Sequence, residues 1–264
     1  MALSGSSAAS SSSVKMSSSS GKASVSSSSK ISVSSSSEIT GSSSSKAVWA
    51  YLNPAISYGK MKDSRDNQVY KTVVIGTQTW MAENLNYKVD SSWCYMDSAG
   101  YCEKYGRLYQ WGAAMDLDVA YNSKMRGGSE VDYQGICPSG WHIPDTTEWQ
   151  TLHDYVEANN GDDSVATSLK STSGWDAGDD GTDAFGFSAL PVGWRDDDGG
   201  FERGISKSSR SEDGTYGIYF WTSTEYEGYS EMGVDWELEN SGSFSMNGKF
   251  RARSLSLRCV MTAD

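Results

Sequence analysis

The stretch of residues 135–152 constrains the fold most, because it specifies a cross-link point, an extended segment and a helix start in succession. Cys137 comes first, and Pro144 later ends the extended segment. Asp145 is placed to cap a new helix with Glu148 three residues on, the pattern of a capping box. The apolar residues that follow recur at helical spacing and predict one broad buried face: Trp149, Leu152, Tyr155 and Val156.

The first 46 residues differ in composition from the rest of the 264-residue chain. They contain 25 serines and neither proline nor an aromatic residue. Such a segment cannot bury enough apolar surface to offset the entropy of ordering. We therefore expect residues 1–46 to be a disordered serine-rich linker or tail, and residues 47–264 to form the folded domain.

The charge of the predicted domain limits its partners. Residues 1–46 hold four of the 22 basic and one of the 34 acidic residues, which leaves 18 basic and 33 acidic side chains and a net charge of −15 in residues 47–264. This argues against nucleic acid and anionic membrane as partners. No apolar run approaches the length that spans a bilayer, and no secretory leader stands at the start of this chain.

Four cysteines permit three disulfide pairings. Cys94 and Cys102 bracket a short polar loop that a disulfide could close, and Cys137 would then pair with Cys259 across most of the domain. The longer closure would contribute about 4 to 5 kcal/mol in the loop-entropy model. A zinc site built from all four cysteines is the alternative, although no two of them have the close spacing that such sites use.

The remaining pattern predicts an α+β domain. Residues 69–75 and 78–81 read as a β-hairpin, while residues 103–117 and 164–170 read as helices, with residues 118–132 as a loop. Five later apolar segments have the length of strands: 185–194, 217–222, 232–238, 244–246 and 254–261. Helices that precede an antiparallel sheet, with a last strand that returns to the centre, indicate this fold class.

Several blocks carry a family resemblance. They include Cys-Pro-Ser-Gly-Trp-His-Ile-Pro at 137–144, Thr-Trp-Met-Ala-Glu-Asn-Leu-Asn-Tyr at 79–87, Phe-Trp-Thr-Ser-Thr-Glu at 220–225 and Leu-Arg-Cys-Val at 257–260. Together they resemble the Fibrobacter succinogenes major paralogous domain. The resemblance implies a secreted or surface protein of a fibre-degrading bacterium, without an agreed activity. The order of elements is similar to the C-type-lectin-like fold and to its formylglycine-generating branch, with two helices plus antiparallel strands.

Catalysis is not the expected function. The formylglycine-generating chemistry would need a reactive cysteine pair, and all four cysteines are better explained as structural. A catalytic triad would have to use His142 or His153, and no Gly-x-Ser-x-Gly sequence accompanies them. His142 follows Trp141 on a predicted buried strand, where we expect a hydrogen-bonded core histidine. A hydrolase or oxidase is therefore the third hypothesis.

Calcium is the one cofactor that the composition raises. Asp176, Asp179 and Asp180 lie in one glycine-rich loop, and hard oxygen ligands on turns suit calcium. The loop matches no EF-hand, and Asp183 in the same region is expected to cap backbone amides instead. We therefore expect no required cofactor and keep calcium as an open alternative at these three aspartates.

Aromatic residues in the loops of the second half predict a ligand site. Aromatic faces beside acids suit a sugar ring, which stacks its axial hydrogens and directs its hydroxyls to polar groups. We expect Trp194 and Trp221 in the core, and a ligand site at Phe201, Tyr226, Tyr229, Trp236 and Glu225. The sequence thus predicts a secreted, non-catalytic recognition module for polysaccharide or another surface glycan. The main alternative is a structural or protein-binding adhesin module without a sugar site.

Overall fold

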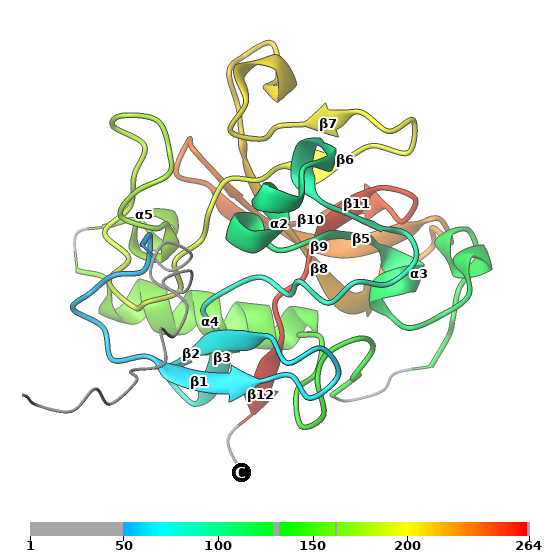
Figure 1. Cartoon of the computed structure of the whole chain (residues 1–264), viewed down its shortest axis with the longest axis horizontal. Coiled ribbons are helices and arrows are strands. Elements are labelled where there is room, and N and C mark those ends of the chain that lie inside the picture. Colours follow the sequence, from blue (N-terminus) through cyan, green and yellow to red (C-terminus); the bar gives the residue numbers. More distant parts are fainter. Residues whose placement is uncertain (1–49, 129–131, 162, 263–264) are drawn as a thin grey trace, which may run out of the picture. The chain divides into compact units, whose positions relative to one another are not determined.

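The computed structural model describes residues 50–128, 132–161 and 163–262. The predicted serine-rich segment, residues 1–46, lies outside the described residues. The described chain has mixed α+β content with two β-sheets (Figure 1). Within these ranges, none of the helices has the length and apolar character needed to cross a bilayer.

The smaller sheet has the strand order β1-β2-β3-β12 and is antiparallel throughout. Its strands are β1 (Gly59–Lys62), β2 (Val69–Ile75), β3 (Gln78–Met81) and β12 (Val260–Thr262). The predicted hairpin is confirmed as β2 and β3, which turn at Gly76. Gly76 has φ +62°, a conformation that favours glycine in a tight turn.

The larger sheet follows the path β10-β9-β8-β11-β5-β4. Its strands are β4 (Ser92–Trp93), β5 (Leu108–Gln110), β8 (Gly217–Glu225), β9 (Met232–Glu239), β10 (Phe244–Phe250) and β11 (Ser254–Ser256). Two short strands lie off this path: β6 (Trp194–Arg195) pairs with β11 and with β7 (Phe201–Glu202). The predicted return of the final segment to the centre is confirmed by β11, which lies mid-sheet (Figure 1). The single strand predicted for residues 254–261 is wrong, because β11 and β12 are separate strands and β12 joins the smaller sheet. Among the named strands of the described chain, the antiparallel prediction fails where β8 and β11 pair in parallel at Phe220 and Ser256.

The prediction of two main helices was too simple. The described residues contain four α-helices: α2 (Ala99–Tyr105), α3 (Trp111–Ala114), α4 (Thr146–Asn159) and α5 (Val165–Leu169). Three short 3₁₀ segments add to them, at η1 (Tyr95–Asp97), η2 (Val119–Asn122) and η3 (Lys207–Ser209). The predicted helix at 164–170 is confirmed as α5, and η2 falls within the predicted loop at 118–132.

The single helix predicted for residues 103–117 is wrong, because β5 separates α2 from α3. Gly106 ends α2 at φ +74°, and a Cβ there would lie 2.7 Å from the Asn84 Cβ and 2.8 Å from two carbonyl oxygens. The chain then extends, so that Leu108 and Tyr109 are both buried and pair with β11. Tertiary pairing outweighs the helical spacing of these apolar residues.

Helix α4 begins as the sequence predicts. The Asp145 side chain accepts a hydrogen bond from the Glu148 N–H at 2.8 Å, and the Glu148 carboxylate accepts one from the Asp145 N–H at 3.0 Å. Trp149, Leu152 and Val156 are fully buried, but Tyr155 is exposed and lies against Gly76 and Phe185 instead. The buried face of α4 therefore includes three of the four predicted residues, without Tyr155.

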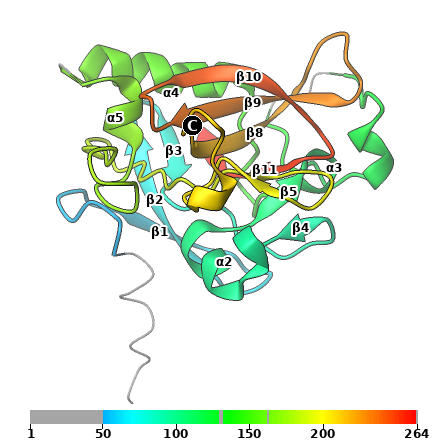
Figure 2. The ribbon, with the colours of Figure 1, turned by 90° about the horizontal axis from the view of Figure 1, so that it is seen from above.

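Trp149 joins α4 to both sheets. Its ring centroid lies 4.8 Å from that of Trp80 on β3 and 5.1 Å from that of Phe220 on β8. Figure 2 shows α4 beside β8, β9 and β10, with α2 and β4 at the other end of the larger sheet. Truncation of a buried tryptophan to alanine costs about 3 to 5 kcal/mol, so this contact is a main determinant of stability.

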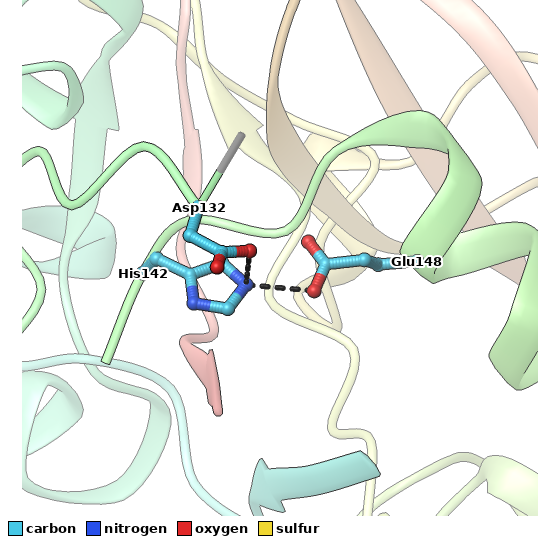
Figure 3. A group of neighbouring side chains, drawn as sticks. All are labelled: Asp132, His142 and Glu148. Carbon is cyan, nitrogen blue, oxygen red and sulfur yellow. Dashed lines mark hydrogen bonds and ion pairs between the residues drawn. The ribbon is translucent and has the colours of Figure 1, made fainter. Parts of the chain in front are cut away.

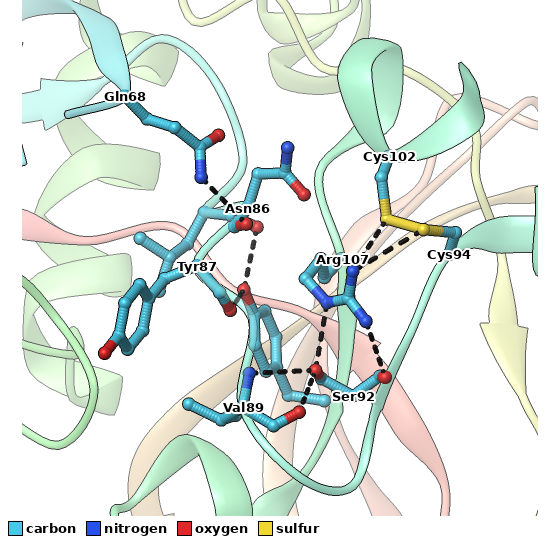
Figure 4. Close-up of a disulfide and its surroundings, with 10 residues drawn as sticks. Gln68, Asn86, Tyr87, Val89, Ser92, Cys94, Cys102 and Arg107 are labelled. Carbon is cyan, nitrogen blue, oxygen red and sulfur yellow. Dashed lines mark hydrogen bonds between the residues drawn. A yellow bond between two sulfur atoms is a disulfide. The ribbon is translucent and has the colours of Figure 1, made fainter. Parts of the chain in front are cut away.

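Both predicted disulfides are confirmed. Cys94 pairs with Cys102 and Cys137 with Cys259, and the described chain has no free cysteine. Arg107 supports the short loop by donating hydrogen bonds to Ser92 and to both sulfur atoms (Figure 4). The pairing leaves no thiolates for the alternative zinc site.

Residues 185–194 do not form the predicted strand, apart from Trp194 in β6. The segment is largely buried, but it touches its neighbours through isolated bridges at Ala189 and Gly193. Pro191 has no N–H to donate to a ladder. Side chains take the place of a partner strand, since Arg258 donates to the Phe187 carbonyl and Trp175 Nε1 donates to the Ala189 carbonyl.

Candidate functional site

The turn between β8 and β9 holds the two most exposed aromatic residues of the predicted ligand site. Tyr226 is 36% and Tyr229 58% exposed, and their rings meet edge to face with centroids 5.7 Å apart. Backbone hydrogen bonds close this turn from the Tyr226 N–H to the Met232 carbonyl and from the Tyr229 N–H to the Tyr226 carbonyl. The tyrosines therefore occupy a defined turn at the end of two long strands.

Gly248 on β10 provides the seat for Tyr226. A Cβ at Gly248 would lie 2.6 Å from two ring carbons of Tyr226 and 3.0 Å from the Met232 methyl carbon. A side chain at this position would therefore displace the ring. The close approach of ring and backbone accounts for a glycine inside a strand, where glycine is otherwise unfavourable.

Two further exposed apolar side chains flank this seat. Met246 and Phe250 lie two residues to either side of Gly248 on β10, and alternate residues of a strand share a face. They are 56% and 49% exposed. We call Tyr226, Tyr229, Met246 and Phe250 the aromatic platform. Exposed apolar side chains grouped around one turn and strand are typical of a ligand or partner site.

A pocket of about 360 Å³ adjoins the turn. Its wall includes Glu225 and Glu227, the neighbours of Tyr226 in the chain. The rest of the lining comes from three other segments: Met125, Arg126, Gly127, Gly128, Asp145, Ser223 and Thr224. Hydroxyl, carboxylate and guanidinium groups thus lie next to the aromatic platform.

Glu225 serves to hold this pocket together. Its carboxylate accepts hydrogen bonds from the N–H groups of Arg126 and Gly127 and pairs with Arg251 at 2.9 Å. Burial opposes ionisation, but these two N–H groups and the Arg251 charge outweigh it and hold the pKa of Glu225 below its usual value. With both oxygens occupied, Glu225 positions the pocket loop rather than offering a free ligand contact.

Two of the predicted ligand residues lie elsewhere. Trp236 is only 2% exposed, and its ring packs against Phe244 with centroids 4.8 Å apart. It therefore belongs to the core and cannot present a ring face to a ligand. Phe201 is half-buried against Tyr95 on the β6–β7 hairpin, so the expectation that it is exposed was also wrong. Trp194 and Trp221 are buried as predicted.

The three aspartates considered for calcium each have a separate protein partner. Asp176 pairs with Arg210 at 2.7 Å, Asp179 accepts from the Tyr216 hydroxyl, and Asp180 accepts from the Trp175 N–H. The hydrogen bond from Arg210 holds the pKa of Asp176 below its usual value.

The structure does not gather these three carboxylates. Where the chain is described, three carboxylate or imidazole ligand atoms come within 4.8 Å of one another at two places, and neither includes these aspartates. Asp183 caps backbone as expected, because it accepts from the Ser188 N–H at 2.6 Å. Burial raises the pKa of Asp183 to about 6.

Comparison with models of known families identifies the family of this chain. The model of the Fibrobacter succinogenes major domain matches residues 73–261. The chain belongs to this family. A search of curated proteins and a search of solved structures each found no match.

In this Fibrobacter succinogenes major domain, His142 is indeed a buried and hydrogen-bonded residue. Its backbone bridges to Val260, and its Nε2 lies 2.7 Å from Glu148 Oε1. His153 lies beside the apolar face of α4, with its ring stacked on Phe244. Both histidines thus have packing roles.

Sequence reasoning missed Met246, Gly248 and Phe250. They lie on β10, for which only residues 244–246 were predicted as a strand. The signal was present in the alternation of Phe244, Met246 and Phe250 around a glycine. Recognition of the site required the pairing of β10 with β9, which places Gly248 opposite Val234 and near Tyr226.

Proposed function

We propose that this domain is a non-catalytic recognition module that binds polysaccharide or another surface glycan at the aromatic platform. The observation that carries the proposal is the exposed pair Tyr226 and Tyr229, of which Tyr226 is seated on Gly248, beside a pocket lined in part by Glu225 and Glu227. Aromatic faces supply stacking area for sugar rings, while the adjacent acids and hydroxyls can accept and donate hydrogen bonds.

The proposal includes an extracellular or cell-surface location and a C-type-lectin-like architecture. Two disulfides support the location, because disulfides persist in oxidising compartments. The long disulfide, the capped helix α4 and the loops that end in exposed aromatic residues support the architecture. A serine-rich tether would let such a module search an insoluble surface, since tethering raises the local concentration of a weak binder.

A pull-down on insoluble polysaccharides and a glycan array test this function. The protein should bind at least one glycan, and the double variant Tyr226→Ala/Tyr229→Ala should bind it more weakly. Loss of these contacts is expected to cost about 1 to 3 kcal/mol, roughly a 5- to 150-fold weaker affinity. Circular dichroism should be unchanged, since both tyrosines lie in a surface turn outside the buried core clusters.

Tyr155→Ala provides the matched control, because Tyr155 is also exposed but lies on α4 against Gly76 and Phe185. It should leave glycan binding unchanged. If wild type binds and the double variant binds equally well, the site lies elsewhere. If no glycan is bound but the platform is needed to capture a surface protein, the adhesin alternative is correct.

A further inference from the structure

The side chains of Asp132, His142 and Glu148 come together at the start of α4. His142 Nε2 lies 2.7 Å from Glu148 Oε1 and 3.5 Å from Asp132 Oδ1 (Figure 3). All three ligand atoms are within 4.8 Å of one another. One imidazole nitrogen thus faces two carboxylates, although it can share a proton with only one of them at a time.

Two of these groups are held rigidly by the fold. His142 exchanges both backbone hydrogen bonds with Val260 at 3.0 Å, next to the disulfide at Cys259. Glu148 is fixed by the capping box, in which Oε2 accepts from the Asp145 N–H. Oε1 remains directed toward the imidazole. Carboxylates that bind a metal ion through one oxygen are usually oriented in this way, by a hydrogen bond to the second oxygen.

The electrostatics of the cluster favour a cation. Burial opposes charging of the imidazole, but the hydrogen bond and charge of Glu148 outweigh it, with further contributions from Asp132 and Asp145. Together they raise the pKa of His142 above its usual value. The carboxylates of Asp132 and Glu148 thus both face the imidazole nitrogen that would share a cation with them, at 3.5 and 2.7 Å.

The distances suit a small transition ion. Tetrahedral zinc with bonds of about 2.0 to 2.1 Å separates its ligand atoms by roughly 3.3 Å. The present separations of 2.7 and 3.5 Å from Nε2 lie on either side of this value, so modest side-chain adjustments would suffice. Asp132 is exposed, so water can reach the site and complete the coordination.

We propose that Asp132, His142 and Glu148 form a binding site for a divalent transition metal ion, with Zn²⁺ as the best match to one imidazole and two carboxylates. Imidazole nitrogen and carboxylate oxygen are both common zinc ligands. Bound metal would tie the segment that contains Asp132 to the start of α4. This inference is independent of the proposed glycan binding.

The test is isothermal titration of the chelator-treated full chain with Zn²⁺ at about pH 7.5, since metal binding requires deprotonated ligands and weakens at low pH. One ion per chain should bind, and it should raise the melting temperature. Asp132→Asn should weaken affinity by at least the roughly 10- to 100-fold that loss of an outer-shell partner costs. His142→Ala should abolish binding. Because Asp132 is exposed, its variant should fold even if the histidine variant does not.

His153, Asp154 and Glu157 provide an internal control, since they are the other described group with metal-ligand spacing. Asp154 and Glu157 are exposed, and His153 is half-buried with its ring stacked on Phe244, without a comparable scaffold. His153→Ala should therefore leave the titration unchanged. Absence of zinc binding by the wild type would overturn the proposal. Zinc binding that is lost in His153→Ala but retained in Asp132→Asn would overturn it as well.

Discussion

The two disulfides should contribute unequally to stability, and the difference follows from the loops that they close. Cys94 and Cys102 are 8 residues apart in the chain, whereas Cys137 and Cys259 are 122 residues apart. The loop-entropy relation gives about 2.5 kcal/mol for the short closure and about 5 kcal/mol for the long one. Replacing Cys137 and Cys259 by alanine should therefore destabilise the domain about 2 to 3 kcal/mol more than the same change at the short pair.

Urea unfolding followed by tryptophan fluorescence measures this difference directly. For a domain of this size each kcal/mol corresponds to about 2 to 4 °C in Tm, so the long-pair variant should melt about 10 to 20 °C lower than wild type. The short-pair variant should lose about half as much and is the matched control. Equal losses, or a larger loss from the short pair, would refute the argument from chain entropy.

Three further predictions concern single side chains. Lys249→Met should lower the free energy of unfolding in urea by about 3 to 5 kcal/mol, because it leaves the buried Asp235 and Glu237 carboxylates without their ammonium partner; an unchanged midpoint would contradict this. Gly248→Ala should weaken glycan binding while the unfolding midpoint changes little, since the added methyl displaces the exposed tyrosine ring above it; wild-type affinity would exclude the platform geometry. In EDTA, the stability that the raised pKa of His142 contributes is complete below the unfolded value of about 6.5 and is lost as pH rises through the folded value. The melting temperature should therefore fall less above about pH 6.5 in His142→Gln than in wild type. An equal fall in both proteins would assign the effect to other groups.

The elements that were predicted correctly depend on local chemistry. The capping box at Asp145 and Glu148 and the β2–β3 hairpin are each specified within a few residues, so their sequences suffice. The disulfides followed from spacing, with only three pairings to consider. The glycan function and the serine-rich tether remain predictions.

The failures share a nonlocal cause. Residues 103–117 have helical spacing, but Gly106 must fit beside Asn84, and the following residues complete a sheet with β11. Trp236 was predicted as a ligand residue from its position near loops. Its alternation with Val234 and Leu238 on β9 places it inside, against Trp149. Contacts between distant segments decide these positions, and a single sequence does not state them.

The candidate site likewise combines features that the local sequence predicts with features that depend on distant segments. Exposure of Tyr226 and Tyr229 could be predicted because they lie in a polar turn rich in glycine and acidic residues. The seat at Gly248 could not, because it depends on the register between β9 and β10. The position of Asp132 beside His142 likewise depends on how a long loop returns to the start of α4.

The most direct measurement is methyl NMR on methionine-labelled protein, titrated with soluble oligosaccharides of the glycan retained in the pull-down. Met232 and Met246 lie at or beside the aromatic platform, while Met81 and Met115 are fully buried. The account predicts saturable shifts of the Met232 and Met246 signals in wild type and their loss in Tyr226→Ala/Tyr229→Ala. Shifts confined to other methionines, or shifts that persist in the double variant, would contradict it.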